Sequence, residues 1–98
     1  MERIMKECEP GQFLIYCPGC CERHAIHTEE FEGDALKWKM SGSKECPTFT
    51  PSLLVRGLHD GSRCHSFIRK GCWEFLLDCT HDLAGKTVEM VPVSEWPE

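Results

Sequence analysis

The chain alternates between apolar and polar residues over short segments, and two of these segments flank a pair of cysteines. Residues 12–16 are apolar and β-prone and run directly into Cys17, while residues 22–28 alternate in polarity. The four residues Cys17 to Cys20 read Cys-Pro-Gly-Cys, which predicts a tight turn. We therefore expect a β-hairpin that carries a CxxC motif at its tip.

Similar patterns recur along the rest of the chain. Residues 64–69 and 72–78 flank Lys70 and Gly71, which predicts a second hairpin. Further strands are predicted at 36–40, which alternate before a break at 41–47, at 53–56 and at 87–93. The pattern predicts a mainly β or α+β fold, a small domain of short antiparallel strands and hairpins with zinc-ribbon-like character. We expect a single zinc-stabilised domain over 1–98, with 1–11 and 94–98 as peripheral tails.

The cysteine content changes this picture, because 8 cysteines among 98 residues is high for so small a chain. A domain of this size often needs disulfides or a metal in addition to its core. The first ten residues carry charges throughout and lack the apolar stretch of a secretory signal. No segment approaches the ~20 apolar residues of a membrane span. We expect a cytoplasmic protein, and in a reducing cytosol clustered Cys and His indicate metal or thiol chemistry rather than disulfides.

The CxxC motif is half of a zinc site, since a structural zinc takes four ligands in a tetrahedron. If Lys70 and Gly71 form the turn of the second hairpin, residues near 64 and 79 meet at its open end. Cys64 and His65 are neighbours on a strand and point to opposite faces, so at most one of them binds the ion. The predicted zinc ligands are Cys17, Cys20, Cys64 and His81, with His24, His65 and Cys79 as alternative ligands or as residues that orient the ligands.

The other four cysteines are interpreted as small buried hydrophobic residues rather than ligands. These are Cys8, Cys21, Cys46 and Cys72.

Two other chemistries compete for the same residues. Cys-Pro-Gly-Cys also resembles the redox motif of glutaredoxins, which would require a helix after Cys17. Alternatively, spare His24 and His65, with Asp78 or Asp82, can serve an open zinc site as base and orienting group in a hydrolytic reaction. A formal net charge of -5 disfavours nucleic-acid binding, which relies on Lys and Arg contacts to phosphate.

Several motifs in order resemble one family of small proteins encoded mainly by tailed bacteriophages and prophages. The resemblance covers most of residues 13–93, and the motifs that carry it are Tyr16-Cys-Pro-Gly-Cys20, Pro47-Thr-Phe-Thr-Pro-Ser52, Cys64-His-Ser-Phe67 and Asp78-Cys-Thr-His-Asp-Leu-Ala-Gly85. It implies Cys or His at the positions of Cys17, Cys20, His24, Cys64, His65 and His81. Some members carry the name ammonia monooxygenase, but that class is a large copper membrane assembly, and this chain is too short and has no span.

The leading hypothesis from the sequence is a phage-type module in which a structural zinc holds a surface for a host or phage protein. An anti-defence or host-takeover role is what the resemblance implies. The alternatives are the zinc-dependent hydrolase and the thiol redox protein, and the sequence favours a binding module over an enzyme.

Overall fold

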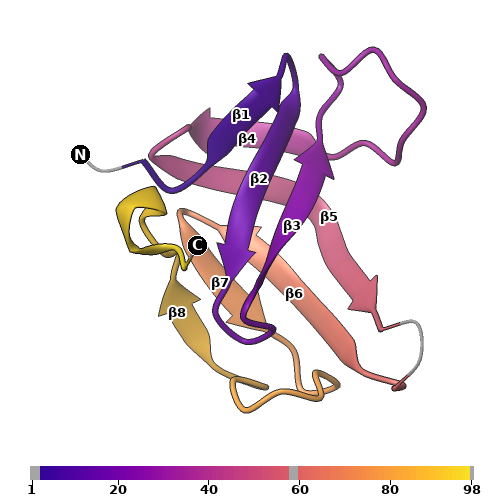
Figure 1. Cartoon of the computed structure of the whole chain (residues 1–98), viewed down its shortest axis with the longest axis vertical. Coiled ribbons are helices and arrows are strands. Elements are labelled where there is room, and N and C mark those ends of the chain that lie inside the picture. Colours follow the sequence, from indigo (N-terminus) through magenta and orange to yellow (C-terminus); the bar gives the residue numbers. More distant parts are fainter. Residues whose placement is uncertain (1–2, 58–59, 98) are drawn as a thin grey trace.

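The computed structural model describes residues 3–57 and 60–97, which form two antiparallel β-sheets (Figure 1). The smaller sheet has the order β1-β2-β3, and the larger one has the order β4-β5-β6-β7-β8. The strands of the small sheet are β1 (Lys6–Glu9), β2 (Gln12–Cys17) and β3 (Glu22–His27). Those of the large sheet are β4 (Lys39–Ser43), β5 (Cys46–Arg56), β6 (Arg63–Arg69), β7 (Cys72–Phe75) and β8 (Thr87–Glu89), and a 3-10 turn, η1, spans Val93–Glu95. The predicted mainly β class is confirmed.

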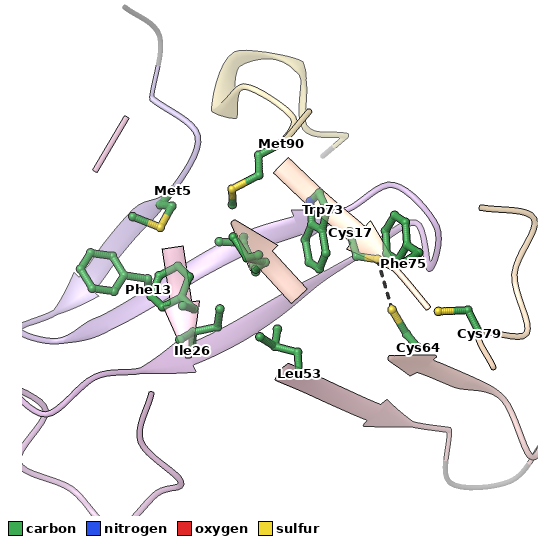
Figure 2. Packing of buried hydrophobic residues seen from close by; sticks show 13 residues of the cluster. Met5, Phe13, Cys17, Ile26, Leu53, Cys64, Trp73, Phe75, Cys79 and Met90 are labelled. Atoms are coloured by element: carbon green, nitrogen blue, oxygen red, sulfur yellow. Dashed lines mark hydrogen bonds between the residues drawn. The ribbon is translucent and has the colours of Figure 1, made fainter. Parts of the chain in front are cut away.

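The core lies where the small sheet packs across the large one (Figures 1 and 2). Alternate residues of β2, among them Phe13 and Ile15, are buried, as the polarity pattern of a half-buried strand requires. On the large sheet, Trp73 is fully buried and stacks on Phe75 with ring centroids 5.3 Å apart. The same cluster continues into Cys17 and Cys64, so the cysteine-rich end is an extension of the core.

Both predicted hairpins are present. β2 pairs with β3 around the Cys-Pro-Gly-Cys turn, and β6 pairs with β7 around Lys70 and Gly71. Lys70 and Gly71 have positive φ angles of 51° and 76°, which match the type I′ turn that suits the twist of a two-residue hairpin. Gly71 adopts this conformation freely, whereas a lysine at Lys70 is strained.

We expect Lys70→Asn to stabilise the protein by about 0.5–1 kcal/mol, because Asn tolerates positive φ better than Lys. The backbone N–H of residue 70 donates to Thr48 Oγ1 at 2.9 Å, and this bond is independent of the side chain. Thermal unfolding should show a rise of the midpoint by about 2–8 °C. A lower midpoint would mean that the Lys70 side chain makes a stabilising contact that outweighs the turn strain.

Two expectations about local structure are corrected. The alternating segment 36–40 is expected to be a strand that breaks at 41–47, but β4 begins at Lys39 and ends at Ser43, inside the predicted break, and Leu36 is exposed. The segments expected to be peripheral tails also contribute to the core. Met5 precedes β1 and is buried, and Trp96 is buried with its indole N–H donating to the Val91 carbonyl at 2.9 Å.

β5 is irregular in the middle, and the irregular stretch ends at Ser52, which belongs to the site described below. Phe49 pairs with Ile68 and Leu53 with Ser66, so residues 50–52 stand opposite the single residue Phe67. The Thr50–Pro51 peptide within this bulge is cis. β4 pairs with β5 only as far as Thr50, so β5 runs on past the end of β4 with only β6 as a partner strand (Figure 1).

Candidate active site and metal centre

Ser52, His65 and Asp78 form a continuous hydrogen-bonded relay on the outer face of the large sheet. Ser52 Oγ lies 3.1 Å from His65 Nε2, and His65 Nδ1 lies 3.2 Å from Asp78 Oδ2. The three residues come from β5, from β6 and from the loop after β7, each 13 positions after the previous one. This is the arrangement of a nucleophile, a general base and an orienting carboxylate.

Ser52 is the last residue of the β5 bulge and reaches the His65 imidazole from outside the regular ladder. In the regular part of the ladder, the residue opposite His65 is Leu54, two residues beyond Ser52. The bulge shifts the register, and bulges of this kind re-aim side chains next to functional sites. The Trp38 indole N–H donates to the Ser52 carbonyl at 3.3 Å and fixes the backbone of the serine from the other side.

The backbone of His65 is held by Cys79 and Leu76. The His65 N–H donates to Cys79 Sγ at 3.2 Å, and the Cys79 thiol donates back to the His65 carbonyl at 3.1 Å. The same carbonyl accepts the Leu76 N–H at 2.9 Å. Cys79, predicted as an alternative ligand, therefore lies against β6 and links it to the loop that carries Asp78.

Asp78 is ionised at neutral pH. Its burial acts to raise the pKa, but the hydrogen bond to His65 and the charges of His65 and Arg63 outweigh it and hold the pKa of Asp78 below its usual range. Arg63 Nη1 lies 3.5 Å from the same carboxylate oxygen that faces His65. An ionised Asp78 selects the His65 tautomer with its proton on Nδ1, and this leaves Nε2 to accept the Ser52 hydroxyl proton.

A second constellation lies on the opposite face of β6. Cys17, Cys20, Cys64 and His81 place their ligand atoms within 4.8 Å of one another and can hold a metal ion. Cys17 ends β2, Cys20 closes the turn to β3, Cys64 lies on β6 and His81 follows Asp78 by three residues. Cys64 and His65 do point to opposite faces, with one in this cluster and the other in the relay.

The donor set suits a tetrahedral zinc. Cys17 Sγ and Cys64 Sγ are 3.8 Å apart, close to the roughly 3.8 Å edge that Zn–S bonds of about 2.3 Å define. Figure 2 shows this sulfur pair at the end of the core, with Phe75 and Cys79 nearby. His81 Nε2 lies 3.4 Å from Cys64 Sγ. The Leu83 N–H donates to His81 Nδ1 at 3.2 Å. A metal on His81 Nε2 would require a proton on Nδ1, so this hydrogen bond would have to be given up when the metal binds.

Without a cation the three thiols share their charge unevenly. The hydrogen bond from Cys64 lowers the pKa of Cys17 to about 4, with help from His24 and the Cys20 N–H and against the effect of burial. Burial and the Cys17 charge raise the pKa of Cys20 to about 12, and the hydrogen bond to Cys17 followed by burial raises that of Cys64. A bound divalent cation would supply the charge that allows three adjacent thiolates.

The Cys-Pro-Gly-Cys turn is shaped to receive His81. A side chain built on Gly19 would overlap the His81 ring, so glycine is required there by close approach and not by its backbone angles. A cavity of about 300 Å³ beside the cluster is lined by Cys20, Cys64 and His81 and gives an ion a path of entry.

We expect Gly19→Ala to displace His81 and to weaken metal binding by at least about tenfold, the scale seen when a residue that supports a ligand is lost. The measurement is competition for zinc against a chromogenic chelator. Cys21→Ala is the matched control, because Cys21 lies in the same turn, is exposed and is outside the cluster. Native affinity in Gly19→Ala would show that His81 is not a ligand.

The remaining predicted residues separate into distinct surroundings. His24 is buried, contacts Trp73 edge-on with ring centroids 6.3 Å apart, and forms a second possible ligand group with Cys20 and Glu22. His65 belongs to the relay. Cys8, Cys21 and Cys46 are exposed and Cys72 is half-buried, so the interpretation of these cysteines as buried is wrong. They lie outside the groups of described residues that can hold a metal.

The structure disfavours the redox alternative. The segment after Cys20 is strand β3, whereas a glutaredoxin-like thiol needs a helix there.

In the described part of the chain, no helix is long and apolar enough to cross a membrane.

Sequence reasoning did not single out Ser52 as a functional residue. Ser52 stood at the end of a motif interpreted as an extended segment, and His65 and Asp78 were considered only as base and orienting group for an open metal site. The BubE family, described as the bacterial ubiquitination-like system serine protease, matches residues 2–76. The chain belongs to the BubE family.

The match to BubE includes Ser52 and His65 but ends before Asp78 and His81. The family match gives a span and no residue roles, so the grouping of all four residues rests on the geometry of the structure. No curated protein and no solved structure shows significant similarity to the chain. The match identifies a bacterial family, and the phage origin implied by the sequence resemblance stays a prediction.

Proposed function

We propose that the chain is a serine peptidase in which Ser52 is the nucleophile, His65 the general base and Asp78 the residue that orients the base. The observation that carries this proposal is the relay from Ser52 Oγ through the two nitrogens of His65 to Asp78, with both contacts at hydrogen-bond distance. The three side chains come from separate elements, so their convergence is a property of the fold. The description of the BubE family as a serine protease supports the same conclusion.

In the proposed reaction, Ser52 Oγ forms a bond to the carbonyl carbon of the substrate while its proton passes to His65 Nε2. The carbon–nitrogen bond then breaks, and the leaving amine takes that proton from His65. A water molecule next gives a proton to His65 and attacks the acyl group on Ser52. The Ser52 oxygen recovers its proton, and the acid product leaves.

The family description supports a proposal for the substrate class. BubE is named for a ubiquitination-like system, so we propose that this chain cleaves polypeptide bonds of proteins processed or joined in such a system. The protein partner expected from the sequence is then its substrate. We place this activity in the bacterial cytoplasm, and nucleic acid is not a proposed partner.

We also propose that Cys17, Cys20, Cys64 and His81 hold a zinc ion with a structural role. Four protein ligands close a tetrahedral site, whereas a catalytic zinc keeps one position for water. The ion would join the tip of the β2–β3 hairpin to β6 and to the loop that carries Asp78. Held in this way, Cys64 fixes the strand that carries His65, and His81 fixes the loop that carries Asp78.

A fluorophosphonate probe tests the proposed nucleophile, because it reacts with serine only where a base activates the hydroxyl. We expect a single adduct, which peptide mapping by mass spectrometry places on Ser52. Ser66 provides an internal comparison, since it is a buried serine one position after His65. Absence of an adduct on folded protein, or an adduct at another serine, would contradict the proposal.

A further inference from the structure

The part of β5 that follows Ser52 is an open strand edge. β4 pairs with β5 only up to Thr50, and β6 pairs with the opposite side of Leu53–Arg56. Figure 1 shows β5 continuing beyond β4 with no strand on that side. The edge therefore lies within the same element as the nucleophile.

The hydrogen-bonding direction of each residue on this edge can be assigned from its neighbours. The Ser52 carbonyl accepts from Trp38 and so faces away from β6, while the Gly57 N–H donates to Ser62 and so faces the β6 side. Because successive residues of a strand direct their N–H and C=O groups to alternate sides, Leu54 and Arg56 face the open side. Their backbone groups have no partner strand in the described part of the chain.

The open edge carries an exposed apolar side chain beside the relay. Leu54 is 44% exposed and pairs with His65 across the β5–β6 ladder. An extended chain added at this edge would lie next to the Leu54 side chain. The His65 and Asp78 side chains are 27% and 40% exposed, so a bound chain would exclude water from the relay.

We propose that the substrate binds as an extended polypeptide segment that adds a strand to the open edge of β5 at Leu54 and Arg56. This inference rests on the proposed function and specifies how the substrate is recognised. Main-chain hydrogen bonds to the edge supply affinity in this mode, and contacts with alternate side chains supply selectivity. Leu54 favours an apolar side chain in the segment, and the Trp38 indole limits the added strand at Ser52.

The spacing suits cleavage next to the edge. Two residues of a strand span roughly 7 Å, so a segment paired at Leu54 needs about two further residues to reach Ser52. A flexible tail or linker can lie along this edge in extended form. The structure thus predicts a substrate whose cleavage point lies in an extended, apolar stretch outside a folded domain.

Two phosphonate probes of different length test this mode. Both carry the same leucine diphenyl phosphonate, and one extends it with acetyl-Leu-Leu while the other ends at the first leucine. We expect the longer probe to label native protein at least tenfold faster. Methylation of the amide nitrogens of the longer probe should remove this advantage, because it blocks strand pairing without changing the side chains.

The matched variants are Leu54→Pro and Glu89→Pro. Leu54→Pro removes an N–H that faces the open edge. Glu89→Pro removes an N–H on the outer side of β8. The backbone groups of Met90 and Lys86 bond toward β7, so those of Glu89, between them, face outward. Leu54→Pro should lose the preference for the longer probe, measured as the ratio of the two labelling rates, whereas Glu89→Pro should retain both rates. Equal rates for the two probes on native protein, or an advantage that survives amide methylation, would overturn the edge proposal. Failure of both probes to label Ser52 would instead contradict the proposed peptidase.

Discussion

Replacing Ser52 by alanine is expected to lower the rate of ester or peptide hydrolysis by about 10⁴-fold or more without unfolding the protein. Loss of the nucleophile of a triad removes the covalent route entirely, so the residual rate is that of binding and transition-state contacts alone. Ser52 is half-buried on the outer face and its backbone is held by Trp38, so the fold should survive the substitution. Hydrolysis of p-nitrophenyl acetate and circular dichroism measure the two effects separately.

The matched control is Ser66→Ala. Ser66 is fully buried on the neighbouring strand, and its Oγ has no hydrogen-bond partner among the described residues. Removing an unpaired buried hydroxyl is neutral or stabilising, and activity should remain native. Native activity in Ser52→Ala would show that Ser52 is not the nucleophile. Loss of activity in Ser66→Ala instead would show that Ser52 is the wrong serine.

Replacing Cys20 by serine is expected to strip the metal and to lower the unfolding temperature sharply. Structural zinc contributes on the order of 10 kcal/mol or more to folding in small domains. Loss of even about 3 kcal/mol of this in a chain of 98 residues corresponds to a fall of roughly 12–24 °C. Zinc content by elemental analysis and thermal unfolding with and without a chelator give the two readouts.

Cys21→Ser provides the control within the same turn, because Cys21 is exposed, its thiol donates to the Pro18 carbonyl at 3.6 Å, and it lies outside the ligand group. It should keep both the metal and the melting temperature. If Cys20→Ser retains native zinc and stability, the four-residue cluster is not the site. Equal losses in both variants would show that the turn itself, and not the ligand, determines stability.

The two constellations are coupled through shared elements. Cys64 and His65 are consecutive on β6, and Asp78 and His81 lie on one loop that Thr80 ties to Arg63 by a backbone hydrogen bond of 2.9 Å. A ligand lost from the cluster therefore loosens both the strand of the base and the loop of its orienting carboxylate.

The local sequence pattern was sufficient to predict the two hairpins and the convergence of the four Cys and His residues that can hold a metal. The Cys-Pro-Gly-Cys turn and the Lys70-Gly71 turn each encode their geometry in a few adjacent residues, and the second hairpin brings Cys64 near the loop of His81. The expectation that Cys64 and His65 point apart follows from strand geometry alone.

The relay could not be predicted in the same way, because its residue types are common and its members are far apart in the chain. Ser52 belongs to the three residues of β5 that stand opposite Phe67, whereas the residue paired with His65 in the ladder is Leu54, so pairing along the strands does not indicate the Ser52–His65 contact. Asp78 meets His65 only because the loop after β7 turns back along β6 through Leu76 and Cys79. Neither the bulge nor the returning loop has a signature in the polarity pattern.

The most direct measurement of the central claim is the mass of the protein after brief mixing with p-nitrophenyl acetate and an acid quench. The account predicts one acetyl group on the peptide that contains Ser52, formed in a burst and absent from Ser52→Ala. Hydrolysis that proceeds without any acetylated protein and stops when a chelator removes the metal would contradict it, and would transfer the chemistry from the serine relay to the cysteine–histidine cluster.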